Sequence, residues 1–169
     1  MQATMWETQR LRCRPIVRGD LASLHQLYRD PTVMRYLGTG QPLSVAQTAE
    51  RLETYLEAWA QAGFGSYALV LKTTEGFIGC GGIEPRSSAE GLEGEIGWVL
   101  ATAYWGQGLA TEFARAMIAV GFEQFALERI FAQAAVRNGA SIRVMQKAGL
   151  TLVRRNEQAV EYAIARSRG

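Results

Sequence analysis

The chain contains 169 residues, of which 48% are hydrophobic and 20% charged, and its formal net charge is +2. This composition is typical of a globular protein with one core, and we predict a single domain over residues 1–169. The charge is too small, and the lysines and arginines too scattered, for a nucleic-acid-binding stripe, so nucleic acid is excluded as a partner. No stretch approaches the roughly 20 apolar residues that span a bilayer, and no apolar signal core precedes Glu7. We therefore expect no membrane partner and a cytoplasmic location.

Two cysteines, Cys13 and Cys80, and one histidine, His25, are the chain's only thiol and imidazole groups. The cysteines lie far apart in the sequence and match no metal-binding spacing. We therefore expect no metal site and two buried or half-buried free thiols.

The first half of the chain alternates between extended and helical patterns. Apolar and basic residues alternate in the first predicted strand, whereas the helices follow apolar residues at helical spacing and carry capping signals at Asp20 and at Ser44 with Gln47. The predicted elements are a strand at 11–16, a helix at 21–28, a short helix at 32–37, a helix ending near Gly63, strands at 67–71 and 77–83, and a polar loop from Pro85 to Gly91.

The second half reads as strand and helix in turn. The predicted elements are a strand at 93–100, a long helix at 109–125, a strand at 129–136, a helix at 141–148 that ends before Gly149, and strands at 150–153 and 160–164. Helices, a meander, and then strand–helix–strand–helix indicate an α+β fold around one central sheet.

A glycine-spaced turn follows the predicted strand that ends at Leu100. Gly106 and Gly108 permit backbone conformations that other residues resist, and they let a ligand approach the main chain. The amides from Gly108 to Thr111 begin a helix and carry the positive end of its dipole, which suits a diphosphate. Gln107 and Thr111 add polar side chains. The same glycines also fit a tight connection that merely permits close packing.

The segment Tyr104 to Glu112, YWGQGLATE, resembles the central motif of the GNAT acyltransferases. Gly108 and Ala110 match its last two defined positions. Trp105 stands where the general pattern has Gln or Arg, and this is similar to the branch that acetylates the N-terminal alanine or serine of ribosomal proteins. Further matches to this branch, over roughly residues 7–155, are Glu7 to Pro15 with Asp20, Asp30-Pro31, Met34 to Gly38, Ile78 to Ile83, and Asn138 to Gly149.

The resemblance implies a GNAT-like α+β domain with a mixed, mostly antiparallel sheet and helices on both faces. It implies an N-acetyltransferase that moves an acetyl group from the co-substrate acetyl-CoA to a primary amine by direct attack in a ternary complex. The strand ending at Leu100 and the next strand would splay to admit the cofactor, and the amide of Val99 or Leu100 would polarise the thioester. The expected cofactor contacts are Val99, Leu100, Trp105, Gly106, Gln107, Gly108, Leu109, Ala110, Thr111, Asn138 and Ser141.

Two residues are the candidate catalytic groups. Glu95, on the strand face of Gly97 and Val99, is the candidate base through a water molecule, although it could merely orient the amine. Glu93, Glu157 and Glu161 are its rivals. Ser141 is the candidate acid because Met145 stands where many relatives have a tyrosine that protonates the thiolate; alternatively, the thiolate takes its proton from water.

The acceptor stays open between a protein N-terminal α-amino group and a small-molecule amine. Loops near Met34 to Pro42 and Pro85 to Gly91 would choose between them, and Trp6, Trp59 or Trp98 could line the pocket. A non-catalytic acyl-CoA-binding regulatory module is a further alternative, which the absence of the tyrosine favours. Dimerisation is a habit of the family, so a homodimer is possible.

Overall fold

The structure, a computed structural model, describes residues 5–89 and 91–167, so residues 1–4, 90 and 168–169 of the predicted domain lie outside the description. The described strands form one sheet in the order β1-β2-β3-β4-β5-β6-β8-β7. They are β1 (Trp6–Glu7), β2 (Leu11–Pro15), β3 (Ser66–Leu71), β4 (Gly76–Ser88), β5 (Gly91–Leu100), β6 (Arg129–Ala135), β7 (Thr151–Arg155) and β8 (Ala159–Ala165). Strands β5 and β6 are parallel and the other neighbours antiparallel, which confirms a mixed, mostly antiparallel sheet.

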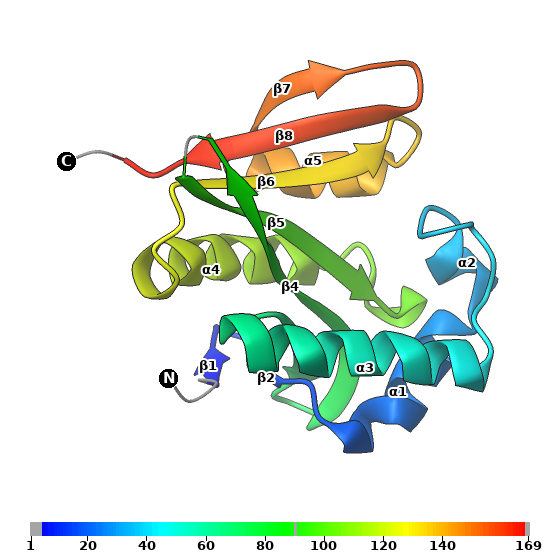
Figure 1. Ribbon diagram of the computed structural model, residues 1–169. Coiled ribbons are helices and arrows are strands. Elements are labelled where there is room, and N and C mark those ends of the chain that lie inside the picture. Colours follow the sequence, from blue (N-terminus) through cyan, green and yellow to red (C-terminus); the bar gives the residue numbers. More distant parts are fainter. Residues whose placement is uncertain (1–4, 90, 168–169) are drawn as a thin grey trace.

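Helices cover both faces of the sheet, as expected. Helices α4 and α5 lie behind it in Figure 1, whereas α1 and α3 lie in front. Each layer has its own core: Phe113 and Met117 of α4 belong to one cluster, and Leu24 of α1 and Leu52 of α3 to the other. The helices are α1 (Leu21–Tyr28), α2 (Pro31–Met34), α3 (Val45–Ala62), α4 (Leu109–Gln124) and α5 (Gly139–Lys147), with 3-10 turns at Arg18–Asp20 and Thr102–Tyr104.

The capping signals of the sequence are confirmed for α3, whereas at α1 Asp20 occupies the N-cap position but makes no side-chain cap. Ser44 and Gln47 form the predicted capping box, and Gly63 ends α3 with φ 74°. The Asp20 carboxylate does not cap α1. It accepts two hydrogen bonds from the Arg14 guanidinium, at 2.7 and 2.8 Å, and a third from the Val17 amide. Burial opposes the charge of Asp20, but these hydrogen bonds outweigh it and lower its pKa.

The predicted polar loop from Pro85 to Gly91 is wrong. Strand β4 continues to Ser88, and its pairing with β5 runs from Gly79 opposite Leu100 to Ser88 opposite Gly91. The end of this ribbon is polar because its side chains are exposed, so it lacks the apolar alternation that marks a half-buried strand. Helix α2 also begins earlier than predicted, at Pro31, where Asp30 caps it and proline suits the first helical position. Strand β1 was not predicted.

The parallel pair β5–β6 separates partway along its length. Its register runs from Glu93 opposite Arg129 to Glu95 opposite Phe131 and stops there. Beyond that point β5 and β6 diverge toward α2 (Figure 1). This confirms the splayed strands that the resemblance implied, and it leaves one edge of the end of β5 unpaired by β6.

Candidate active site

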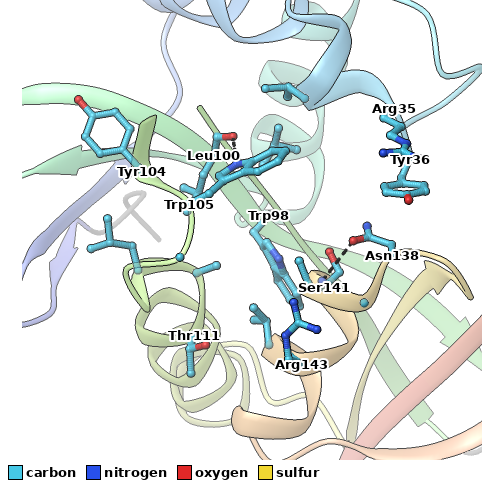
Figure 2. A pocket seen from close by; sticks show the side chains of 18 of the residues that line it. Arg35, Tyr36, Trp98, Leu100, Tyr104, Trp105, Thr111, Asn138, Ser141 and Arg143 are labelled. Atoms are coloured by element: carbon cyan, nitrogen blue, oxygen red, sulfur yellow. Dashed lines mark hydrogen bonds between the residues drawn. The ribbon is translucent and has the colours of Figure 1, made fainter. Parts of the chain in front are cut away.

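A cavity of about 490 Å³ lies where β5 and β6 separate. This volume is within the range of small-molecule binding sites. Figure 2 shows side chains from α2, β5, the turn before α4, and α5 around it. Its lining comprises Thr32, Val33, Arg35, Tyr36, Leu37, Trp98, Val99, Leu100, Tyr104, Trp105, Gly106, Gly108, Leu109, Ala110, Thr111, Arg137, Asn138, Gly139, Ala140, Ser141, Arg143, Val144 and Lys147.

Backbone alternation on β5 distinguishes Val99 from Leu100. The Ala101 amide donates to the Ile78 carbonyl of β4 at 2.9 Å, so the backbone amide of Ala101 points toward β4. The amide of Val99, two residues earlier, points the same way because amide directions alternate along a strand. The Leu92 carbonyl accepts from the Glu128 amide on the opposite edge of β5. The β4–β5 register shows no shift between these points, so Leu100 directs its amide at the gap.

The turn before α4 presents backbone amides to the cavity. Gly106 and Gly108 have φ values of 71° and 77°, which favour glycine. The first hydrogen bond of α4 joins the Glu112 amide to the Gly108 carbonyl at 3.0 Å. Within the described residues, the amides from Leu109 to Thr111 have no hydrogen-bond acceptor, and they carry the positive end of the helix dipole.

The Trp105 side chain fixes the start of this turn. Its Nε1 donates to the Leu100 carbonyl at 2.8 Å, so the indole ties the turn to the end of β5 (Figure 2). The Gln107 side chain does not line the cavity, because its Nε2 donates to the Ala103 carbonyl at 3.0 Å. The predicted contact of Gln107 with the cofactor therefore has no geometric support from its side chain.

Glu112 anchors the same turn to the N-terminal strands. Its carboxylate accepts hydrogen bonds from the Thr8 hydroxyl at 2.5 Å, from the Arg10 amide at 2.7 Å and from Arg10 Nε at 2.6 Å. The Arg10 guanidinium also donates to the Gln107 carbonyl at 2.8 Å. Burial opposes the charge of Glu112, but these donors outweigh it and lower its pKa.

Helix α5 supplies the opposite wall. The side-chain oxygen Oδ1 of Asn138 accepts a hydrogen bond from the Ser141 amide at 3.2 Å and caps the helix. The Ser141 side chain lines the cavity. Met145 is 1% exposed and belongs to the core, so its side chain faces away from the cavity.

The cavity has a strongly biased charge. Arg35, Arg137, Arg143 and Lys147 line it, whereas no described lining residue carries a carboxylate. A cleft lined by one sign of charge concentrates ligands of the opposite sign. Together with the amides of α4, these cations favour an anionic, phosphate-bearing ligand.

Comparisons with known proteins agree with this geometry. The family model described as Acetyltransferase (GNAT) domain matches residues 10–151. The uncharacterized protein YkkB of Bacillus subtilis (strain 168) is 34% identical over 149 residues, which are 85% of this chain and 83% of that protein. The chain belongs to the GNAT acetyltransferase family. The crystal structure of an acetyltransferase from Agrobacterium tumefaciens str. C58 matches the present structure with a TM-score of 0.82 at 25% identity. The match covers 98% of the present chain and 96% of the Agrobacterium chain.

Two solved structures that share the fold are named for different acceptors. RimL, a ribosomal L7/L12 alpha-N-protein acetyltransferase in complex with coenzyme A, has a TM-score of 0.81 at 18% identity, covering 96% of this chain and 98% of that chain. The spermidine N-acetyltransferase from Vibrio cholerae, in complex with CoA and spermine, has a TM-score of 0.78 at 18% identity, covering 94% and 96%. At 18% identity these structures show only that the fold is shared, and they do not select an acceptor.

Glu95 lies outside the cavity of this acetyltransferase, on the β5 face that Gly97 and Val99 share. Its carboxylate is 2.8 Å from the Arg86 guanidinium. A Cβ built on Gly97 meets no atom within 4 Å, so the face beside Glu95 is open. The rivals Glu93 and Glu161 both pair with Arg129, at 3.1 and 2.7 Å, just as Glu95 pairs with Arg86, so ion pairing alone does not separate the three. Glu95 differs in lying beside the open face at Gly97.

Several residues that line the cavity were missed or left open at the level of sequence. Trp98 lines it, whereas Trp6 and Trp59 pack around Tyr67. Tyr36 carries no signal of its own in the sequence, yet its hydroxyl donates to the Arg137 carbonyl at 3.3 Å and links the segment after α2 to the residues before α5. The α2 segment has no ligand signal of its own, because only the folded chain brings it beside β5.

The remaining polar groups do not indicate other chemistry. Cys80 is buried, and this burial raises its pKa to about 11 even though the Tyr28 hydroxyl contacts its sulfur at 3.2 Å. It is therefore a poor nucleophile at neutral pH. Across the described residues there is no cluster of three or more metal-binding side chains and no helix long and apolar enough to cross a membrane.

Proposed function

We propose that this protein transfers the acetyl group of acetyl-CoA to a primary amine by direct attack in a ternary complex. The observation that carries the proposal is the cavity at the split of β5 and β6, with its cationic lining and free α4 amides. A diphosphate fits these amides, and the separated strands leave room for the pantetheine arm beside β5. Membership of the GNAT family supports the same donor.

The Leu100 amide, rather than that of Val99, is placed to polarise the thioester. It faces the gap, and its strand is held by the hydrogen bond from Trp105 to the Leu100 carbonyl. The neutral amine attacks the carbonyl carbon, the carbon–sulfur bond breaks, and the oxygen that gains charge accepts a hydrogen bond from this amide.

Two side chains complete the proton balance of the reaction. Glu95 takes a proton from the incoming ammonium through a water molecule, on the open face of β5 beside Gly97, and so supplies the neutral amine that attacks. Ser141, on the α5 wall of the cavity, gives a proton to the departing thiolate and regains one from the attacking nitrogen, which is positively charged after the attack. Ser141→Ala tests the role of Ser141 as the acid: kcat should fall, and the affinity for acetyl-CoA should not change.

A thiol-release assay tests the proposed function and finds the acceptor class. The protein is incubated with acetyl-CoA and, in separate arms, peptides with free N-termini, polyamines, aminoglycosides and amino acids. We expect release of coenzyme A only when one of these acceptor classes is present. Double-reciprocal plots of initial velocity against one substrate, at several concentrations of the other, should intersect. Binding of acetyl-CoA without turnover in any arm would contradict catalysis and favour the binding module. Parallel plots would contradict direct attack.

A further inference from the structure

Three cations without carboxylate partners meet at the edge of the donor cavity, on the side of α4. Arg143 and Lys147 lie one turn apart on α5, and both line the cavity. Arg115 of α4 donates to the Lys147 carbonyl through Nε at 3.0 Å and Nη2 at 2.9 Å. Within residues 5–89 and 91–167, none of these three cations forms an ion pair with a carboxylate, so the charge of each is available to an anionic ligand in the cavity.

This cluster, Arg115, Arg143 and Lys147, stands where two cavities join. A second cavity of about 820 Å³ lies against α4 and the residues before β2, and Arg115 lines it. Gly108, Thr111 and Lys147 line both cavities, so the second one begins directly beside the free α4 amides. The carboxylates in the second cavity are already paired: Glu112 with Arg10 at 2.6 Å, and Glu7 with Lys72 at 2.8 Å.

Resting on the proposed function, we infer that the cluster of Arg115, Arg143 and Lys147 binds the 3′-phosphate of the donor's ribose. Coenzyme A carries a diphosphate and, on the adjoining ribose, a phosphomonoester that is close to a dianion at neutral pH. The diphosphate is matched by the backbone amides from Leu109 to Thr111. The 3′-phosphate has a more concentrated negative charge, which cationic side chains bind best, and the cluster lies next to the α4 amides, where the two cavities join.

The two other cations of the donor cavity do not serve this phosphate. Arg35 lies beside Tyr36, away from Arg143 and Thr111 (Figure 2), and the Tyr36 hydroxyl donates to the Arg137 carbonyl just before α5. The Arg35 guanidinium lies over the Tyr36 ring, 5.2 Å from its centre. The cationic side chains therefore form two groups, and only one adjoins the α4 amides.

Acetyl-CoA and acetyl-dephospho-CoA, which lacks only the 3′-phosphate, distinguish this inference from the proposed function. We expect the wild-type kcat/KM for acetyl-CoA to exceed that for acetyl-dephospho-CoA by about 10-fold or more, because the second thioester cannot form the charge-assisted hydrogen bonds of the 3′-phosphate. The double variant Arg143→Gln with Lys147→Gln should raise the KM for acetyl-CoA about 10-fold and change that for acetyl-dephospho-CoA less than about twofold. Arg155→Gln, an exposed arginine on β7, is the matched control.

A binding measurement keeps the test independent of turnover. Adenosine 3′,5′-bisphosphate should raise the melting temperature of the wild type, adenosine 5′-monophosphate should raise it less, and the double variant should not distinguish them. Equal use of both thioesters by the wild type, or equal losses for both in the double variant, would overturn the 3′-phosphate site. Failure of the protein to bind or use either thioester would instead overturn the proposed function.

Discussion

Glu95 has a neighbour across the sheet that allows its chemical role to be isolated. Glu84 of β4 is its partner in the register, and Arg86 reaches both carboxylates, at 2.8 Å for Glu95 and 3.7 Å for Glu84. The two residues therefore share a face and a cation but differ in the strand that carries them. Only Glu95 belongs to β5, the strand that leads to the proposed thioester site at Leu100.

Glu95→Gln should lower kcat about 100-fold at neutral pH, the usual order for a lost general base. The affinity for acetyl-CoA should change little, because Glu95 does not line the donor cavity. The loss should shrink as the pH rises, since more of the amine is then neutral without a base. Glu84→Gln is the control and should stay within about twofold of the wild type. An equal loss at every pH, or in both variants, would remove Glu95 from this role.

Gly97 marks the route by which the acceptor would reach the thioester. Its Cα is exposed on the face of Glu95, and an added Cβ there meets no atom within 4 Å. Gly97→Leu should therefore fold normally yet raise the KM for the acceptor about 10-fold or more by filling this space. The dissociation constant of acetyl-CoA should not change.

Gly19→Leu is the matched control for Gly97, because a Cβ on Gly19 also meets no atom within 4 Å, in the 3-10 turn before α1. Steady-state kinetics and a donor titration of both variants decide the point. Unchanged acceptor kinetics in Gly97→Leu would place the acceptor route elsewhere.

At the scale of elements, the first turn of α4 depends on a link to the chain's N-terminal strands. Glu112 binds Thr8 and Arg10, and Arg10 in turn binds the carbonyl of Gln107. The site turn is thus held from a segment about 100 positions earlier in the sequence. The resemblance included both segments, but nothing in the pattern of either one indicated that they touch.

Glu112→Gln should lower the free energy of unfolding by about 1–2 kcal/mol at pH 7, because it removes charge-assisted hydrogen bonds from a largely buried carboxylate. The folded pKa of Glu112 is lowered, so its stabilisation is complete above the ordinary glutamate pKa and is lost as the pH falls through the folded pKa. The difference from the wild type should therefore shrink toward about pH 3. Urea unfolding at both pH values measures it.

Glu123→Gln, on the exposed face of the same helix, controls for the loss of one negative charge. It should change the stability little at either pH. A Glu112→Gln deficit that stays constant down to pH 3 would show that the carboxylate charge is not what stabilises the turn.

At the scale of the whole molecule, regular local patterns were the predictable part. The apolar stripe of α4, the capping box of α3 and the glycine turn at Gly106 and Gly108 each show a short-range signal, and the structure contains all three. The β4–β5 ribbon beyond Pro85 was missed because its exposed side chains lack alternation. The contribution of α2 to the cavity was missed because it arises from tertiary packing. The direction of the Leu100 amide needed the register of β4 with β5.

The donor cavity joins segments from both halves of the chain, so a bound donor should stabilise the molecule as a unit. At about 100 times its dissociation constant, acetyl-CoA should add about 2.7 kcal/mol and raise the melting temperature by about 5–10 °C. Gly108→Trp should abolish this shift, because Gly108 lines both cavities beside the free amides and an indole there fills the diphosphate site.

Gly63→Trp separates loss of the ligand from backbone strain. Gly63 and Gly108 have nearly the same left-handed φ, 74° and 77°, so tryptophan pays a similar conformational cost at each. Gly63 ends α3, does not line the donor cavity, and has no atom within 4 Å of an added Cβ. We expect both variants to melt below the wild type and only Gly63→Trp to keep the acetyl-CoA shift. A full shift in Gly108→Trp would mean that the turn is a structural connection and that the diphosphate binds elsewhere.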